Sequence, residues 1–511
     1  MHEIVTLQLG QRSNYIATHF WNTQESYFTY AADEESRVDH DILFRPGIGA
    51  DGTETFTPRT LIYDLKGGFG SLKKINALYE IGEEGGMPKG LWDGPTATQV
   101  QPAIEESPYQ RSLNEGVQPP PLTADDVRYW SDFNRVFYHP RSIVQLNEYD
   151  LHSALLPFEK WSAGEDLFAS LDKEHDVLDR DLRPFLEECD QLQGVQVLTG
   201  VDDAWGGFAA RYMDRMRDEF GKTSIWVWAS EDGRRTGKEK QRQRTVNLAR
   251  AYDEIASQAS LYVPLIDPPG GRVAETFLVA TSAWESSAWT SMAVETMLLP
   301  PRLRARNRTR PTLGDMEATL TPDRRRRIAQ LQLNGREAEQ APADAHESRA
   351  GGQSHPATAC LTHFDMDLSA GMDETTTIEP RPGHTFGQVE VFRDRGEEGD
   401  PNVHQDGQPP RTRYDADAPL LTRFRTDLLF PLLDSFPSLD GGQAPLNRPA
   451  ARPVRAGLST TTQSGQRVDA IRRAVERVVG LDERESLLNG LGEIAEAYRD
   501  GWDSGSDEDD D

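Results

Sequence analysis

The sequence predicts an α/β protein whose main sheet is largely parallel and covered by helices. Short runs of strand-favouring apolar residues recur along the first half of the chain, separated by stretches with helical periodicity. They occupy residues 4–9, 60–64, 195–199 and 224–229. This alternating order favours parallel strands joined by helical crossovers. Ligands bind such sheets at the carboxyl ends of the strands, which we expect here at residues 10–13, 64–68 and 200–203.

Helices are predicted where apolar residues recur at helical spacing. Phe208, Tyr212 and Met216 predict a helix over 208–220 that stops at Gly221, and the apolar region 276–299 predicts another that is ended by two prolines. Two further stripes predict a pair of packed helices near the C-terminus. Their members are Val468, Ile471, Val475 and Val478, and then Leu487, Leu488, Leu491, Ile494, Ala495 and Tyr498.

Three segments lack apolar periodicity and are expected to be loops or disordered inserts: 95–123, 334–358 and 395–417. Residues 503–511 carry six acidic side chains in nine positions and are expected to be a solvated tail.

Charge and composition exclude several classes of protein. The chain has 511 residues, with 55 Lys and Arg against 84 Asp and Glu, and its net charge of −29 would repel phosphate backbones. We therefore expect no nucleic-acid partner. No run of 18 apolar residues occurs, so we expect no transmembrane segment and at most a peripheral membrane association. Two cysteines are too few for a disulfide framework, which fits a reducing, intracellular compartment.

The N-terminus resembles that of tubulins. Residues 3–16 read EIVTLQLGQRSNYI and are followed by Phe20 and Trp21, which matches the tubulin pattern REIVxIQxGQCGNQI and its later FW. Residues 61–68 (LIYDLKGG) resemble the tubulin segment VLVDLEPG, and 161–164 (WSAG) resemble WAKG. Residues 188–196 (ECDQLQGVQ) nearly repeat ECDxLQGFQ, and 217–220 fall where tubulins have REEY. Matches in one order over about 230 residues imply a tubulin/FtsZ-type fold.

Features in the second half of the chain indicate which tubulin-related family it resembles. Residues 430–433 (FPLL) lead into 434–440 (DSFPSLD), and the chain carries long polar inserts that ordinary tubulins lack. This combination is similar to the Misato family of tubulin-related proteins. The resemblance implies four parts: an N-terminal tubulin-like segment (1–117), its core continuation (118–310), a divergent α+β domain with flexible inserts (311–500), and the acidic tail (501–511).

The nucleotide pocket implied by this resemblance is incomplete. Phosphate binding needs backbone N–H groups aimed at the ligand, and tubulins supply them with a GGGTGSG loop. The equivalent residues 201–207 read VDDAWGG, and the paired carboxylates of Asp202 and Asp203 would repel a triphosphate unless Mg²⁺ lay between them. No segment matches the acidic GxxNxD loop with which one tubulin subunit completes its neighbour's hydrolytic site.

A vestigial pocket is nevertheless expected from the residues that remain. Its candidates are Gly10, Gln11, Asn14, Asp64, Gly206 and Gly207. The alternative for Gly10, Asn14 and Asp64 is ordinary strand-to-helix turn and capping chemistry, which we favour. We expect no resident cofactor, with GTP as the alternative.

The function implied by the resemblance is non-catalytic. A Misato-type protein would act in mitochondrial partitioning, distribution and morphology and in inheritance of mitochondrial DNA, on the cytosol-facing surface of the organelle and in the cytoplasm. Residues 1–10 support a location outside the organelle, because their pattern predicts a core strand rather than an Arg-rich import signal. The alternatives are a GTP-dependent polymerising switch and a tubulin assembly cofactor. Expected partners are proteins of the mitochondrial surface, the cytoskeleton or a chaperonin.

Other motifs predict no further site. Residues 233–238 (GRRTGK) have the wrong glycine spacing for a phosphate loop and are expected to be a basic surface loop. The arginines at 302–310 and 324–327 are expected to form a solvated basic face or to meet the acidic tail, with anionic headgroups or an acidic partner as the alternative. The eleven histidines lack the pairing of a helical metal site, so no metal is expected.

Overall fold

The computed structural model describes most of the chain, and every structural statement below concerns these residues. They are 2–29, 35–50, 52–76, 78–79, 104–271, 282–304, 310–334, 364, 366–371, 383–394, 419–438, 450–478 and 480–499. Most of the inserts expected at 334–358 and 395–417, and the tail at 501–511, lie outside them.

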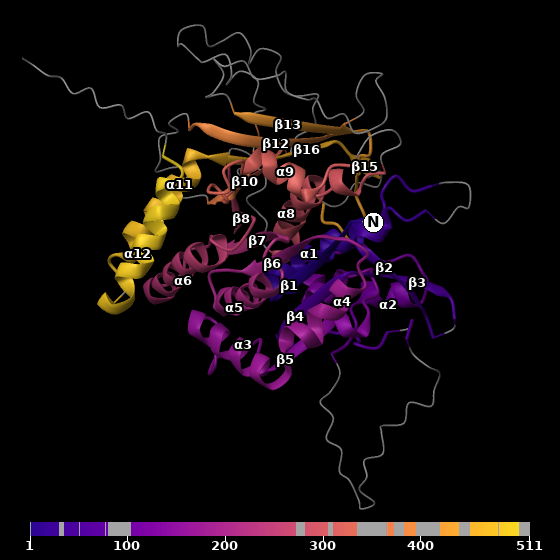
Figure 1. The fold of residues 1–511 in the computed structure, drawn as a ribbon. Coiled ribbons are helices and arrows are strands. Elements are labelled where there is room, and N and C mark those ends of the chain that lie inside the picture. Colours follow the sequence, from indigo (N-terminus) through magenta and orange to yellow (C-terminus); the bar gives the residue numbers. More distant parts are fainter. Residues whose placement is uncertain are drawn as a thin grey trace, which may run out of the picture.

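The centre of the fold is a six-stranded parallel sheet with the order β5-β4-β1-β6-β7-β8 (Figure 1). Its strands are β1 (Glu3–Leu9), β4 (Thr60–Lys66), β5 (Ile143–Asp150), β6 (Leu192–Gly200), β7 (Ser224–Asp232) and β8 (Leu261–Asp267). The four strands expected from the sequence are confirmed, and they form the middle of the sheet. Both faces of β1 are buried along its whole length, which explains its nearly continuous apolar character.

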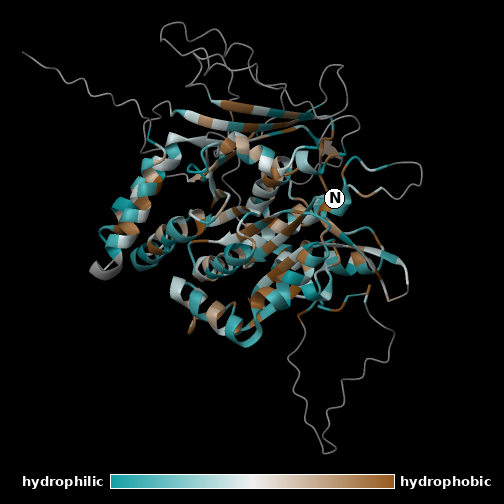
Figure 2. Cartoon of the chain, in the orientation of Figure 1, coloured by the Kyte–Doolittle hydropathy of each residue, from teal (hydrophilic) through white to brown (hydrophobic). Residues whose placement is uncertain are grey.

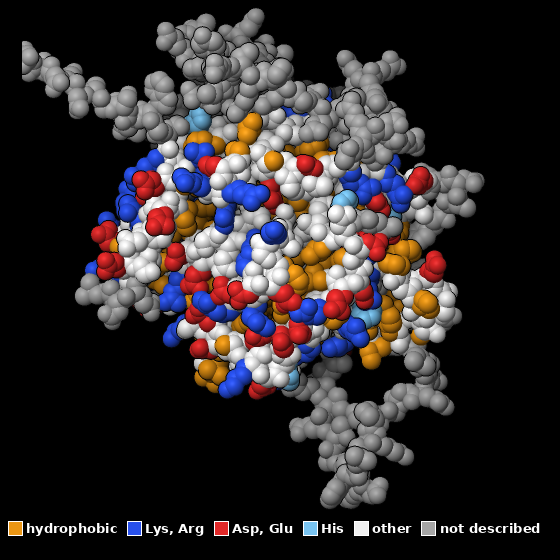
Figure 3. All heavy atoms as spheres, in the orientation of Figure 1, with side chains coloured by type: hydrophobic (Ala, Val, Ile, Leu, Met, Phe, Trp, Pro, Cys, Tyr) orange, Lys and Arg blue, Asp and Glu red, His pale blue; other side chains and the backbone are white. Residues whose placement is uncertain are grey.

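Helices cover both faces of this sheet, as predicted. One face packs against α1 (Gln11–Glu25) and α8 (Ala283–Met297), and the other against α3 (Trp161–His175), α4 (Arg183–Glu187) and α5 (Ala204–Glu219). The helix α6 (Lys238–Arg250) lies beside α5. Figure 2 shows the apolar residues concentrated on the strands and on the inward sides of these helices. On the face shown in Figure 3, acidic and basic side chains are interspersed.

A second six-stranded sheet follows, with the order β13-β12-β16-β10-β11-β9. It consists of β9 (Pro269–Gly271), β10 (Gln330–Asn334), β11 (Met366–Gly371), β12 (Thr385–Arg393), β13 (Leu420–Thr426) and β16 (Val454–Thr461). Only β12 and β13 pair in parallel; the other pairs are antiparallel. With α9 (Leu313–Leu320), α11 (Thr462–Val475) and α12 (Leu481–Glu496), it makes the sheet-rich second part of the fold (Figure 1).

The remaining elements are short. They are the hairpin β2 (Phe44–Ile48) and β3 (Glu54–Pro58), the pair β14 (Phe430–Pro431) and β15 (Ala451–Arg452), the helix α2 (Pro108–Asn114), the 3₁₀ turns η1 (His40–Ile42), η2 (Ala124–Asp126), η3 (Trp130–Phe133), η4 (Pro140–Ser142) and η7 (Pro300–Arg302), and the π-helical turns η5 (Leu178–Leu182) and η6 (Ala251–Ala256).

The helix α2 corrects the expectation of an irregular segment over 95–123. Ser107 caps it by accepting a hydrogen bond from the backbone N–H of Gln110, and Pro108 occupies its first turn. Tyr109 is its buried anchor, and its hydroxyl donates to Asp434 over 2.9 Å. The helix is too short to show apolar periodicity, so only its capping residues could have indicated it.

A buried ionic cluster ties α8 to the second sheet. Glu295 accepts a hydrogen bond from Arg302 at 2.9 Å and forms an ion pair with Arg393 on β12, and all three side chains are at most 1% exposed. The hydroxyl of Tyr27 donates to Glu295 over 3.1 Å. The expectation that Arg302 belongs to a solvated basic face is therefore wrong, because this arginine neutralises a carboxylate in the core.

Within the described ranges, no helix combines the length and the apolar character needed to cross a membrane. The segment GRRTGK lies where expected: residues 233–237 form an exposed loop between β7 and α6.

Candidate functional site

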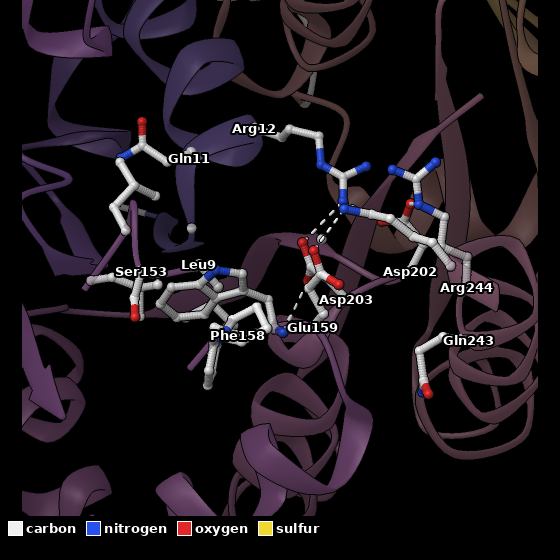
Figure 4. A pocket seen from close by; sticks show the side chains of 17 residues that line it. Leu9, Gln11, Arg12, Ser153, Phe158, Glu159, Asp202, Asp203, Gln243 and Arg244 are labelled. Carbon is white, nitrogen blue, oxygen red and sulfur yellow. Dashed lines mark hydrogen bonds and ion pairs between the residues drawn. The ribbon is translucent and has the colours of Figure 1, made fainter. Parts of the chain in front are cut away.

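A cavity of about 290 Å³ opens at the carboxyl ends of β1, β4 and β6, where an open parallel sheet binds its ligands. Two of the six predicted pocket residues, Gly10 and Gln11, line it. The other members of its lining are Leu9, Arg12, Leu65, Leu151, Ser153, Pro157, Phe158, Glu159, Gly200, Asp202, Asp203, Trp205, Lys240, Gln243 and Arg244 (Figure 4).

The floor of the cavity is closed by Trp205. A Cβ added to Gly10 would lie 2.4 Å from the indole Nε1 of Trp205, so the indole rests on the bare backbone of the first strand-to-helix turn. Gly10 has a φ of +83°, a conformation that glycine adopts readily and other residues rarely do. Phe158 also packs against the indole in an edge-to-face contact, with ring centroids 5.2 Å apart. The close approach that a glycine allows a phosphate is thus used here by an aromatic side chain.

Asp203 occupies the N-terminus of α5, where an anionic ligand would be expected to bind. Its side chain caps the helix by accepting from the backbone N–H of Trp205 at 3.0 Å. Arg12 then bridges both aspartates: Nη2 lies 3.0 Å from Asp203 and forms a second ion pair with Asp202 (Figure 4). The chain therefore supplies its own carboxylate to the positive end of this helix.

Nearby cations and hydrogen-bond donors partly offset the repulsion between the two aspartates. Asp202 is 2% exposed and also accepts from the backbone N–H of Asp232 at 3.1 Å, with Arg244 at 3.6 Å. Burial acts to raise the pKa of Asp202, but the charge and hydrogen bond of Arg12 outweigh it and hold that pKa below its ordinary value. Desolvation, together with the charge of Asp202, raises the pKa of Asp203. Arg12 therefore pairs with the two carboxylates that we expected to repel a triphosphate.

Asp64 is enclosed by hydrogen-bond donors at the end of β4. Its Oδ2 accepts from Gln11 at 2.6 Å, from Asn14 at 2.7 Å and from the indole of Trp130 at 3.1 Å, and its Oδ1 accepts from the backbone N–H of Leu65 at 2.8 Å. Burial raises the pKa of Asp64 to about 7 in spite of these donors. The structure brings together Gln11, Asn14 and Asp64, as predicted, but their polar atoms are turned toward one another.

Gly206 and Gly207 lie on the helix surface that packs against α3. A Cβ on Gly207 would come within 2.1 Å of the carbonyl oxygen of Trp161, and one on Gly206 within 2.5 Å of the indole of Trp161. Gly164 faces them from α3 and would place a Cβ 1.8 Å from the carbonyl oxygen of Ala204. These glycines permit a close crossing of two helices and do not line the cavity.

Comparison with known proteins agrees with the tubulin-like fold. A family model described as the Misato Segment II tubulin-like domain matches residues 2–115, and one described as the tubulin domain matches residues 119–303. The chain is 49% identical to protein dml1 of Aspergillus niger and 48% identical to protein dml-1 of Neurospora crassa, over the full length of each chain. It is 33% identical to protein dml1 of Schizosaccharomyces pombe over 66% of this chain and 73% of that relative.

The chain belongs to the Misato/Dml1 family of tubulin-like proteins.

The residues that decide the chemistry of this Misato-family site include two that the sequence did not single out. Arg12 stands where the tubulin pattern has a cysteine and is not among the predicted pocket residues, although it forms ion pairs with two consecutive aspartates. Trp130 comes from a 3₁₀ turn 66 residues beyond Asp64, so nothing local points to their contact.

The opposite wall of the cavity is also paired internally. Lys240 on α6 lies 2.6 Å from Glu159, and Arg244 lies 2.5 Å from Asp232. Among the residues that the structure describes, no group of three or more His, Cys, Asp or Glu side chains could hold a metal ion. This Misato-family cavity therefore presents ion pairs, rather than free cations or metal ligands, to whatever enters it.

Proposed function

We propose that the protein is a non-catalytic, tubulin-like factor that acts at the cytosol-facing surface of mitochondria, in their partitioning, distribution and morphology and in the inheritance of their DNA. The observation that carries the non-catalytic part is the placement of Trp205 on Gly10. The organelle is what membership of the Misato family implies, and protein contacts at the mitochondrial surface or peripheral contact with the membrane would provide attachment.

Three features of the cavity support the absence of nucleotide chemistry. The indole covers the backbone that a phosphate would approach, Asp203 occupies the positive end of α5, and Arg12 is held by two carboxylates. A triphosphate would have to displace the indole and compete with a carboxylate fixed to the chain, which costs binding energy that the remaining contacts must recover.

The experiment for this part is calorimetric titration of the purified full chain with GTP and Mg²⁺. We expect no dissociation constant at or below micromolar, the range that corresponds to about −8 kcal/mol. A tubulin of known affinity, titrated under the same conditions, is the positive control. Micromolar or tighter binding would overturn the non-catalytic reading.

Location is tested separately by adding protease to intact, isolated mitochondria. We expect the protein to be digested while the outer membrane is whole, together with a cytosol-facing marker and before a matrix marker. Survival until the membrane is ruptured would place the protein inside the organelle.

The second candidate, a nucleotide-dependent switch, is favoured by one observation. A cavity of about 290 Å³ remains at the strand ends, close to the lower limit for small-molecule sites, and Lys240 and Arg244 reach it. Guanine nucleotide retained through gel filtration would support the switch. Co-purification of tubulin or chaperonin would support an assembly cofactor instead.

A further inference from the structure

A second cavity, of about 590 Å³, shares no lining residue with the first and lies beside the last helix. Its walls are the end of η6, the segment 324–328 and the C-terminal turns of α12. Arg324, Arg325 and Arg327 line it on one side, and Glu493 and Glu496 line it on the α12 side. It is a strongly charged hollow in which arginines outnumber carboxylates.

The arginines in and next to this cavity differ in the interactions that their side chains make with the rest of the protein. Arg326, just behind the lining, stacks on the ring of Phe386 at 3.8 Å and donates to the carbonyl of Ala497 at 2.7 Å. Arg327 donates to the carbonyls of Arg324 and Ser257. Arg324 and Arg325 are exposed, and no carboxylate among the described residues lies within ion-pair distance of either.

The same segment anchors the end of α12. The hydroxyl of Tyr498 accepts from the backbone N–H of Ile328 at 2.6 Å and donates to its carbonyl at 3.1 Å. With the contact between Arg326 and Ala497, this fixes residues 497 and 498 beside the arginines. Whatever follows residue 499 therefore starts at the edge of the cavity.

The residues that follow are strongly acidic. Residues 500–511 contain seven carboxylates, at Asp500, Asp503, Asp507, Glu508, Asp509, Asp510 and Asp511. Twelve residues can span up to about 40 Å, far more than is needed to return to a surface that borders their attachment point. A short tether gives such a segment an effective concentration of the order of millimolar, so individually weak ion pairs can act together.

We propose that the acidic segment 500–511 docks on the cavity lined by Arg324, Arg325 and Arg327. Competing basic sites in the described part of the 302–310 run are already occupied: Arg302 is buried with Glu295, while Arg310 lies 2.7 Å from Asp39 and Arg304 lies 2.7 Å from Glu35. The carboxylates of Glu493 and Glu496 repel the acidic segment and limit its affinity. Because the attraction to the arginines is electrostatic and exposed to solvent, salt should weaken the contact. Docking covers the two unpaired arginines and keeps other polyanions away from them.

The test measures how fast phenylglyoxal modifies each arginine in the full-length chain, site by site, by mass spectrometry. The comparison variant carries Asn at the six aspartates of 500–511 and Gln at Glu508, which keeps the length of the segment and removes its charge. Arg111 on α2 is the internal reference, because it is exposed and α2 lies across the molecule from α12 (Figure 1).

At 0.05 M salt we expect Arg324 and Arg325 to react at least threefold more slowly in the native chain than in the neutral variant, with Arg111 unchanged. Raising the salt to 0.5 M should remove most of that difference, because the Debye length falls from more than 10 Å to a few ångströms. Equal rates in the two chains at low salt would overturn the proposal. Protection that persists in the neutral variant would also overturn it, since something other than the acidic segment would then cover these arginines.

Discussion

The indole of Trp205 rests on the Cα of Gly10, so that a Cβ at position 10 would fall 2.4 Å from Nε1. This contact joins the end of the first strand to the first turn of α5, two elements almost 200 residues apart in the chain. The need for glycine at position 10 therefore depends partly on the indole at position 205, and mutations at both positions can measure this dependence.

Replacing Gly10 with Ala should destabilise the fold by about 2–4 kcal/mol, because the new methyl group meets the indole and the φ of +83° is strained for Ala. Chemical denaturation of the single variants and of the double variant with Trp205→Ala measures the coupling. We expect the double variant to lose less stability than the sum of the singles. Gly67→Ala is the matched control, because Gly67 has a similar φ of +85° but a Cβ there would meet nothing within 4 Å. If the stability losses of the two single variants simply add in the double variant, backbone strain alone accounts for the cost of Gly10→Ala.

Replacing Arg12 with Met should cost about 2–4 kcal/mol, since it leaves Asp202, which is 2% exposed, with Arg244 at 3.6 Å as its remaining charged partner. The loss should be at the low end of that range if solvent reaches the site, because Arg12 itself is 27% exposed. Adding Asp202→Asn removes the charge of this carboxylate and should restore part of the stability. Urea denaturation of the three proteins at one pH provides the measurement, and a loss below about 0.5 kcal/mol for Arg12→Met would contradict the ion-pair account.

Asp64 should make stability depend on pH. The pKa of its carboxyl is raised by burial to about 7, while the unfolded chain has the ordinary value near 4. Below pH 4 both states are protonated, and between pH 4 and 7 only the folded state keeps its proton, so the contribution of Asp64 declines as the pH rises through this window. From pH 5 to pH 8 this amounts to about 2–3 kcal/mol. Asp64→Asn should remove this part of the slope in denaturation curves at pH 5, 6, 7 and 8; parallel profiles for the two proteins would refute it.

Replacing Gly207 with Ala should destabilise the protein by about 1–3 kcal/mol, even though Ala favours a helix, because its methyl group would meet the carbonyl oxygen of Trp161 at 2.1 Å. Gly221→Ala, which meets a single atom at 3.4 Å, should be close to neutral and serves as the control. Thermal denaturation compares them. An unchanged melting temperature for Gly207→Ala would show that α3 can move away from α5.

The sequence predicted the central sheet because its middle strands are buried on both faces and read as continuous apolar runs. The outer strands β5 and β8 are not predicted by the sequence: β5 carries polar residues at half of its positions, and Pro264 interrupts β8. The strands of the second sheet come from segments far apart in the chain, and their pairing depends on contacts that no local pattern records.

The candidate site was only partly predictable for the same reason. Strand ends at one edge of a parallel sheet placed Gly10, Gln11, Asn14 and Asp64 near one another, as the structure shows. The glycines at 206 and 207 matched a loop pattern, but their neighbours on α3 determine their use. The bridge from Arg12 to Asp202 spans 190 positions and becomes visible only when the chain is folded.

The carboxylate of Asp203 at the start of α5 has a consequence for how the protein is maintained in a cell. A fold whose phosphate-type site is completed by a bound metabolite gains stability in proportion to the logarithm of that metabolite's concentration. Here the anion and its arginine are covalently part of the chain and are present at a fixed ratio of one to one. On the proposal that the chain binds no guanine nucleotide, we expect the folded fraction to stay constant when the guanine nucleotide pool is depleted, so that the amount of folded protein follows synthesis and degradation.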